Sequence, residues 1–209
     1  MAMKMALKEI VTSEFDYNTL LYALREYHFP RNKIRNLLIS GEIIRVKKGL
    51  YVKSNSSYSL PVLASMVYGP SYISQHFALA AYGLIPERVH IITSMTLGRR
   101  KRFDTPLAVF NYEPIPERLF SLGLRRIELS PTQPYQIASP EKAILDIICK
   151  RSELDTAEAL EHYLIQDLRL DINHGEIFSI SRARMLERAY KKKTATALLK
   201  LLLQKAQYE

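Results

Sequence analysis

A basic segment near the N-terminus carries the side chains best suited to recognising another molecule. No aspartate or glutamate occurs between Arg31 and Gly41, whereas arginine, lysine and asparagine are frequent. Arginine can bond bidentately to guanine and asparagine to adenine in the major groove of DNA, and an exposed isoleucine can contact a thymine methyl group. The candidate DNA contacts of this segment are Arg31, Asn32, Lys33, Arg35 and Asn36.

Helical periodicity places these polar side chains on one face. At about 100° per residue, Ile34, Leu37 and Leu38 form an apolar stripe that must pack on other helices, and the polar residues lie opposite it. Pro30 suits the first helical position, where its missing N–H is not needed. Gly41 suits the left-handed residue that ends a helix. We therefore predict a helix over about residues 31–40.

A basic hairpin is expected directly after this helix, over residues 42–53. Apolar residues at alternating positions predict two strands with one buried face, joined by a turn at residues 47–49. In this arrangement the basic side chains of the hairpin would project toward the phosphates beside the groove. They are Arg45, Lys47, Lys48 and Lys53.

Two further helices are expected before the basic helix, over about residues 4–11 and 17–27, the second with Asp16 as its N-cap. Two helices, a tight turn, a basic helix and a basic hairpin form the order of a winged helix-turn-helix, which puts one helix into the major groove. We predict such a DNA-binding domain over residues 1–53. The alternative is a small helical domain whose basic face serves only solubility.

The charge of the chain is concentrated in the same region. The 209 residues carry a formal net charge of +9 and a sequence pI of about 9.6, which favours a polyanion as partner. Residues 1–60 hold 10 Lys and Arg against 5 Asp and Glu, a net charge of +5; the net is +3 over residues 61–150 and +1 over residues 151–209. The excess therefore lies where the DNA-binding domain is predicted.

Residues 54–59, the only stretch rich in serine and asparagine, predict a linker to a second domain over residues 60–209. Its short polar side chains offer little surface for fixing two domains together, so we expect separable units.

The second domain is predicted to have helices at about 61–67, 74–83 and 142–150, and strands at 89–94, 107–112, 124–129 and 134–138. Helices at about 156–168 and 179–207 form a helical tail from about residue 151. This pattern predicts an α+β fold, with a mixed α/β second domain.

The sequence offers no convincing catalytic site. Neither of the glycine-rich phosphate-binding motifs occurs, and the five histidines are scattered. The single cysteine, Cys149, lies in an apolar run and is expected to be a buried structural thiol. No apolar run approaches the roughly 20 residues of a membrane span, and no signal-type segment begins the chain. We expect a cytoplasmic protein that is not an enzyme, with no metal, no cofactor and no membrane partner.

A second basic cluster, Arg99, Arg100, Lys101 and Arg102, lies between two predicted strands. We interpret it as a loop tip, because no core would accept four consecutive cations. It would contact nucleic-acid phosphates or an acidic partner such as a toxin, or it would be only a solvated hairpin tip.

Three blocks of the sequence resemble the AbiEi-type antitoxins of bacterial abortive-infection, or type IV, toxin–antitoxin systems. They are IRVKKGLY at residues 44–51, YGPSYISQHFALAAYGLIP at 68–86 and IASPEKAILD at 137–146, and they come in the order of that family. The tail beyond about residue 150 is similar only in helical character. Lys48 stands where the family's hairpin usually has an arginine before the glycine.

The resemblance implies an N-terminal winged helix-turn-helix that represses its own operon, and a second domain that antagonises a toxin of nucleotidyltransferase fold in phage defence. The partners it implies are operator DNA and the cognate toxin, and it places the DNA contacts on the basic helix and hairpin named above. A dimer on DNA is compatible with this interpretation. Two other functions stay open: a transcription factor whose second domain senses a small molecule or dimerises, and an RNA-binding protein that uses the second basic cluster.

Overall fold

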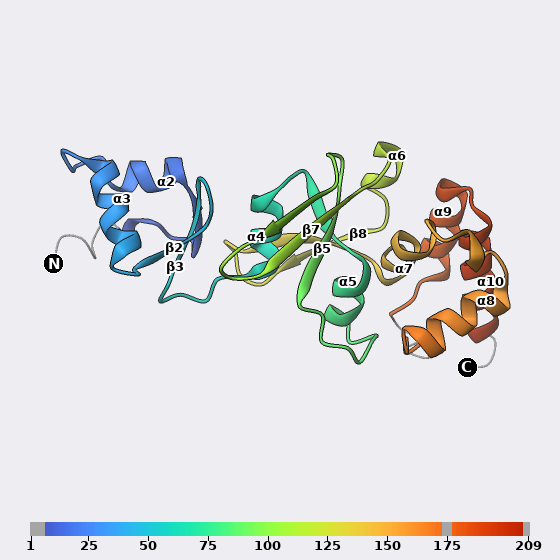
Figure 1. Cartoon of the computed structure of the whole chain (residues 1–209). Coiled ribbons are helices and arrows are strands. Elements are labelled where there is room, and N and C mark those ends of the chain that lie inside the picture. Colours follow the sequence, from blue (N-terminus) through green and yellow to red (C-terminus); the bar gives the residue numbers. More distant parts are fainter. Residues whose placement is uncertain (1–6, 173–176, 207–209) are drawn as a thin grey trace.

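The computed structural model describes residues 7–172 and 177–206. It has a mixed α+β fold: a small antiparallel sheet with helices at the N-terminus, a six-stranded mixed sheet in the centre, and helices at the C-terminus. These three parts follow one another along the molecule, as Figure 1 shows. No helix within the described ranges is long and apolar enough to cross a membrane.

The N-terminal unit contains β1 (Glu14–Asp16), α2 (Tyr17–Ala23), α3 (Pro30–Ile39), β2 (Ile43–Lys47) and β3 (Leu50–Lys53). The strands pair antiparallel in the order β1-β3-β2. The buried residues between α2, α3 and the sheet form the core of the unit: Phe15, Leu20, Leu24, Ile34, Leu37, Ile43 and Tyr51. The predicted basic helix and hairpin are both confirmed, the helix to within one residue.

Local signals also set the ends of these elements as expected. The Thr19 N–H donates to the Asp16 carboxylate at 2.8 Å, so Asp16 is the N-cap of α2, and this bond lowers the pKa of Asp16. Pro30 is the first residue of α3, and Gly41 after it has a left-handed φ of +71°.

Two predictions for this unit need correction. The helix expected to reach residue 27 ends at Ala23, because the following N–H groups bond three residues back instead of four: Arg25 N–H donates to the Tyr22 carbonyl oxygen, and Tyr27 N–H to the Leu24 carbonyl oxygen. Of the helix expected at 4–11, residues 7–9 are helical and residues 4–6 lie outside the described ranges. Strand β1 was not expected, since three residues are too short to show an alternating pattern.

The central sheet contains β4 (Ser71–Ile73), β5 (Ile91–Thr96), β6 (Lys101–Asp104), β7 (Val109–Pro114), β8 (Leu124–Glu128) and β9 (Pro134–Ala138), in the order β6-β7-β5-β4-β9-β8. β4 pairs parallel with β9 and β5 with β7, and the other pairs are antiparallel. The four predicted strands are present. β6 replaces part of the expected loop tip, and this charged strand lies at a sheet edge, where charged side chains are common.

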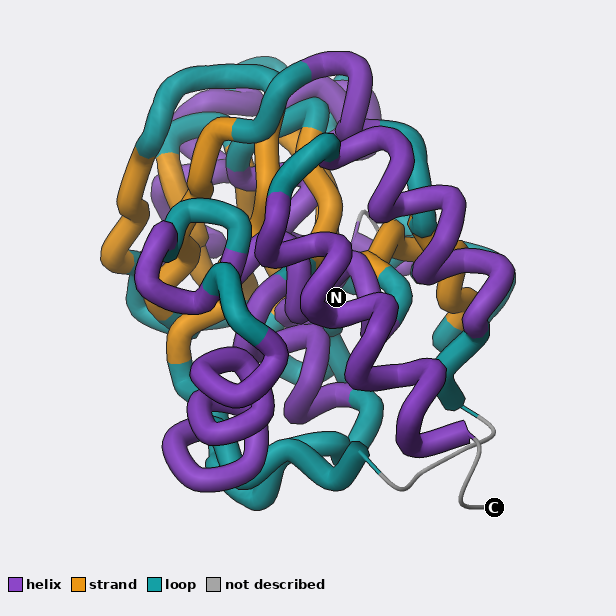
Figure 2. Tube along the Cα trace, turned by 90° about the vertical axis from the view of Figure 1, so that its right-hand side faces the viewer, coloured by secondary structure: helices purple, strands orange, loops and turns teal. Residues whose placement is uncertain are grey.

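Helices α4 (Leu60–Val67), α5 (Gln75–Ala81), α6 (Glu117–Phe120) and α7 (Pro140–Ile148) accompany this sheet. The C-terminal helices are α8 (Ala157–His162), which continues into a π-helical turn at Tyr163–Asp167, α9 (Ile180–Tyr190) and α10 (Lys193–Ala206). Figure 2, viewed from the C-terminal side, shows these helices in front of the strands. One hydrophobic core joins the sheet to them, with Leu79, Phe110, Ile144, Leu186 and Leu201 among its buried members.

The N-terminal unit is packed against the central one, contrary to the expectation that little surface would fix them together. Val46, Leu50 and Val52 of the β2–β3 hairpin belong to the same buried cluster as Leu63 and Val67 of α4. One face of the hairpin therefore closes the N-terminal core and the other joins the central core. The composition of the linker could not predict this contact, because the side chains that make it belong to the strands before the linker.

A buried carboxylate adds a second tie between the units. The Glu14 side chain of β1 is almost fully buried and accepts hydrogen bonds from the Ser59 N–H and from Gln133 Nε2, the latter at 3.0 Å. Ser59, expected in the linker, is the N-cap of α4. A buried carboxylate needs such donors, so these bonds hold the beginning of α4 and the β8–β9 turn against β1.

Candidate nucleic-acid interface

The polar face of α3 is open to solvent. Arg31, Asn32, Arg35 and Asn36 are exposed, while Ile34 and Leu37 on the opposite side are buried, as the periodicity predicted. Ile39 completes the outer face with 74% of its surface exposed. The helix therefore presents arginine, asparagine and one aliphatic side chain on a single surface, a set that matches the hydrogen-bonding and methyl groups of base-pair edges.

The cations of α3 have no acidic partner nearby. Neither Arg31 nor Arg35 forms an ion pair with any described residue, and the Lys33 ammonium lies 4.8 Å from the centre of the Tyr27 ring. The half-buried Lys33 is thus held by a cation–π contact, while the two arginines remain available to an anionic partner.

An exposed aromatic residue stands beside this face and was missed in the sequence. Phe29, immediately before α3, is 73% exposed. In the sequence this residue falls in the tight turn before the basic helix, just ahead of Pro30. A large apolar side chain in that turn was the one signal that could have suggested an exposed aromatic residue. Because an isolated exposed side chain is common on protein surfaces, Phe29 is assigned here only as a neighbour of the polar face.

The cations of the hairpin do not all project as expected. Arg45 and Lys48 are exposed, but the Lys47 ammonium turns inward, donates a hydrogen bond to the Val67 carbonyl oxygen and lies 5.6 Å from the centre of the Phe103 ring. Burial, with the nearby Lys101 as a smaller cause, lowers the pKa of Lys47. The Lys53 ammonium likewise donates to the Ile10 carbonyl oxygen. Their expected free projection toward phosphates is therefore wrong.

The second basic cluster divides into paired and unpaired cations. Arg100 pairs with Glu113 at 2.7 Å, and Arg102 pairs with Asp104 at 3.0 Å. Arg99 is exposed, and its backbone N–H donates to the Tyr68 hydroxyl at 3.1 Å. The Lys101 ammonium lies 4.6 Å from the centre of the Tyr68 ring. Neither Arg99 nor Lys101 has an ion-pair partner among the described residues.

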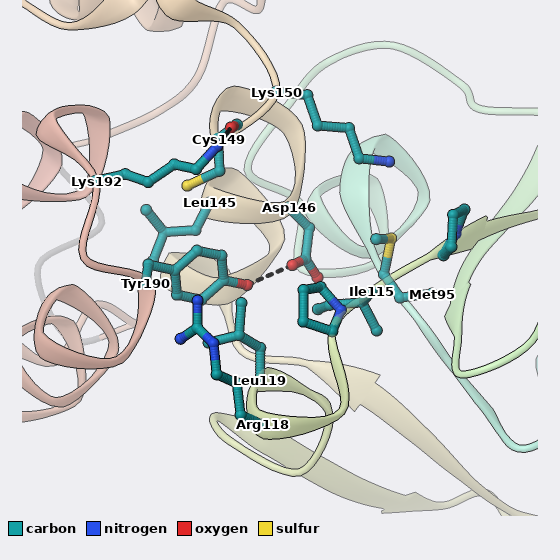
Figure 3. A pocket seen from close by; sticks show the side chains of 12 residues that line it. Met95, Ile115, Arg118, Leu119, Leu145, Asp146, Cys149, Lys150, Tyr190 and Lys192 are labelled. Atoms are coloured by element: carbon teal, nitrogen blue, oxygen red, sulfur yellow. Dashed lines mark hydrogen bonds between the residues drawn. The ribbon is translucent and has the colours of Figure 1, made fainter.

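A separate polar cluster lies between α7, α9 and the central sheet, around the buried carboxylate of Asp146 on α7. It accepts hydrogen bonds from the hydroxyls of Ser74 at 2.6 Å, Tyr72 at 2.9 Å and Tyr190 at 2.5 Å. Burial and the carboxylate raise the pKa values of both tyrosines well above their ordinary value. Figure 3 shows Asp146 and Tyr190 meeting at the edge of a small pocket of about 130 Å³.

The neighbouring buried charges have partners of their own. The Lys142 ammonium donates to the Leu119 carbonyl oxygen at 2.7 Å and to the Tyr190 hydroxyl at 3.4 Å, and burial lowers its pKa. Glu141 forms a bidentate pair with Arg182 of α9, at 2.9 and 3.0 Å. Because each of these groups is hydrogen-bonded, the cluster ties α7 to α9 and to the central sheet. The sequence did not predict this network, because its members come from segments far apart in the chain.

The pocket beside Asp146 is mostly apolar. Met95, Ile115, Leu119 and Leu145 line it, and Cys149 lies half-buried at its edge with Sγ 3.6 Å from Thr194 Oγ1. Burial raises the pKa of the Cys149 thiol, which fits a structural thiol more than a reactive one.

No protein-family model and none of the curated proteins compared matches this chain.

Proposed function

We propose that the N-terminal unit is a winged helix-turn-helix that binds DNA, with α3 as the helix that enters the major groove. The observation that carries this proposal is the solvent-exposed, acid-free face of α3, which presents Arg31, Asn32, Arg35 and Asn36 while the opposite face is buried. The order α2, α3, β2, β3, with β1 paired to β3, supports it because this is how such domains are built.

The hairpin supplies the phosphate contacts of this interface. Arg45 and Lys48 are exposed cations without an ion-pair partner among the described residues, and they follow α3 directly in the chain. Phosphate contacts position a protein on the duplex, and base contacts give specificity. Lys47 and Lys53 are left out of the interface, since their ammonium groups are bound within the protein.

We further propose that the chain is a cytoplasmic, non-enzymatic antitoxin of the AbiEi type, which represses its own operon and antagonises a toxin of nucleotidyltransferase fold. This proposal is supported by the resemblance of residues 44–51, 68–86 and 137–146 to that family. Two of these blocks meet in space, because Tyr72 and Ser74 of one donate to Asp146 of the other. Their pattern is therefore explained by packing, and no toxin-contacting residue is transferred from them.

A second candidate is a transcription factor whose second domain senses a small molecule. A cavity of about 630 Å³ favours it, with polar side chains from several elements in its lining: His76, Glu87, Thr93, Asn111 and Asp167. Burial, with Arg151 as a smaller cause, lowers the pKa of His76 and favours the neutral imidazole, which has both a donor and an acceptor nitrogen for a polar ligand. This candidate would be favoured if the affinity of the protein for DNA changed on addition of a metabolite, in the absence of any toxin.

The DNA-binding proposal is tested with the duplex upstream of the protein's own gene. Arg35→Ala should weaken binding by about 1–3 kcal/mol and relax the preference at one base pair. Arg126→Ala is a matched control, because Arg126 is exposed on β8 and, among the described residues, pairs only with Glu128. Equal affinity of the Arg35→Ala variant and the wild type at fixed salt would reject the recognition-helix assignment, and stronger binding to RNA than to duplex DNA would favour an RNA partner.

The antitoxin proposal is tested by producing the chain together with the product of the neighbouring gene. Growth should be inhibited by that product alone and restored when this chain is present. A neighbour that does not inhibit growth, or inhibition that the chain leaves unchanged, would reject the antitoxin role without affecting the DNA-binding proposal.

A further inference from the structure

We propose that the second domain takes part in DNA binding through a basic surface at the junction of the two units, which contacts phosphates of the same duplex that α3 reads. This junction patch consists of Lys48 from the hairpin turn, Arg99 from the loop before β6 and Lys101, the first residue of β6. The inference rests on the proposed DNA-binding function and adds a second-domain contact to it.

A pair of aromatic rings lies where the hairpin turn meets β6: Tyr68, at the end of α4, and Phe103 of β6. Tyr68 and Phe103 lie with ring centres 6.1 Å apart. The Lys101 ammonium lies over Tyr68 and the Lys47 ammonium over Phe103, at 4.6 and 5.6 Å from the ring centres. The Lys47 bond to the Val67 carbonyl holds this arrangement in place. Lys47 and Lys101, more than 50 residues apart in sequence, therefore lie at the same pair of rings. The exposed Lys48 follows Lys47 directly, and the exposed Arg99 lies two residues before Lys101.

Strand geometry separates the cations in and beside β6 into two groups. Successive side chains of a strand point to opposite faces, so Lys101 and Phe103 share the face that meets the hairpin, while Arg102 points the other way. Arg100 lies just before the strand and pairs with Glu113, the neighbour of Tyr112 on β7, which puts it on the same side as Arg102. The register agrees, because Lys101 lies opposite Tyr112, whose ring packs on Tyr68 and Phe103. The two arginines on the other face are the ones that pair with acids.

The chemistry of the junction patch favours a phosphate diester. Lys48, Arg99 and Lys101 have no ion-pair partner among the described residues, and Lys47 and Lys101 repel each other. Positive side chains held close together without acids are stabilised by an anion placed between them. Because the hairpin is the element expected to lie along the backbone beside the groove, the adjacent phosphates of the duplex are the anions within reach.

The test compares two double variants that remove the same charge from the two faces of β6. Arg99→Gln with Lys101→Gln removes the two junction patch cations that follow the linker and leaves Lys48 in place, and Arg100→Gln with Arg102→Gln is the control on the opposite face. Glutamine keeps a long side chain. In the control, Glu113 keeps Lys150 as an ion-pair partner, and the exposed pair of Arg102 and Asp104 contributes little to stability. Affinity is measured by fluorescence anisotropy over a range of salt concentrations, on the upstream duplex and on a duplex of random sequence, after thermal unfolding has shown both variants folded.

The junction variant should weaken binding to both duplexes and reduce the slope of log affinity against log salt by about 1–2, since each lost phosphate contact reduces it by about 0.9. The control should keep the wild-type slope. An unchanged slope for the junction variant, or an equal change in both variants, overturns the inference, even if the junction variant no longer neutralises the toxin. If Arg35→Ala still weakens binding in that case, the proposed function stands; if no variant and no duplex shows binding, both proposals fall.

Discussion

The Lys47 ammonium donates a hydrogen bond to the Val67 carbonyl oxygen at the end of α4. A cation at a helix C-terminus is favourable because unpaired carbonyl groups and the helix dipole make that end negative. The bond thus joins the hairpin turn of the N-terminal unit to the first helix of the central one. It gives two adjacent lysines, Lys47 and Lys48, different roles.

We expect Lys47→Ala to lower the free energy of unfolding by about 1–2 kcal/mol, because a hydrogen bond from a charged group to a helix end is lost. Lys48→Ala should leave stability unchanged and weaken DNA binding, because Lys48 is exposed and unpaired among the described residues. Chemical denaturation and anisotropy measure the two effects. The opposite pattern, with Lys48→Ala the less stable variant, would show that the roles are reversed.

The shared core at the junction predicts that the two units unfold together. Val52 is fully buried in the cluster that joins the hairpin to α4, so Val52→Ala should cost roughly 1–3 kcal/mol by leaving a cavity. Val11→Ala makes the same change at a side chain that is 81% exposed and should have little effect. In calorimetry the full chain should show one transition, lowered as a whole by Val52→Ala. Two separate transitions, with only the first lowered, would mean that the junction does not couple the units.

The buried pair of Glu141 and Arg182 predicts a large effect in the C-terminal helices. Arg182→Ala leaves the fully buried Glu141 carboxylate without its guanidinium partner and should cost about 3–5 kcal/mol. Arg184→Ala removes an exposed arginine from the same helix and should cost less than about 0.5 kcal/mol. Urea denaturation of the two variants checks this. Equal stability would indicate that the Ser179 N–H, which also donates to Glu141, suffices to satisfy the carboxylate.

The tyrosines around Asp146 predict the behaviour of the protein in alkaline solution. The pKa values of Tyr72 and Tyr190 are raised by burial and by the carboxylate, so the folded state favours their neutral form. Their contribution to stability is therefore complete below their ordinary pKa near 10 and is lost as the pH rises above it. Ultraviolet titration should show Tyr72 and Tyr190 ionising only as the protein unfolds. Ionisation of all tyrosines near pH 10 with the fold intact would contradict the buried network.

Several elements could be predicted from the sequence because their causes are local. The position of α3 follows from the spacing of Ile34 and Leu37 and from Pro30, and the side chain of Asp16 caps α2 through a residue only three positions away. Apolar alternation likewise predicted the hairpin and four strands of the central sheet. Such signals act within a few residues, so no knowledge of the rest of the chain is needed to interpret them.

Other features depended on residues far apart in the sequence. Strands β1, β4 and β6 have only three or four residues, and they form because neighbouring strands supply their hydrogen bonds. The same holds for side chains. Lys47 looks like a free cation in the sequence, but its ammonium donates to a carbonyl oxygen 20 residues away. Asp146 acquires its three hydroxyl donors from two other segments of the chain. The sequence alone determined which residues could carry charge to a partner. Tertiary packing decided which of them are free to do so, because a buried charge must first find its own partner inside the protein.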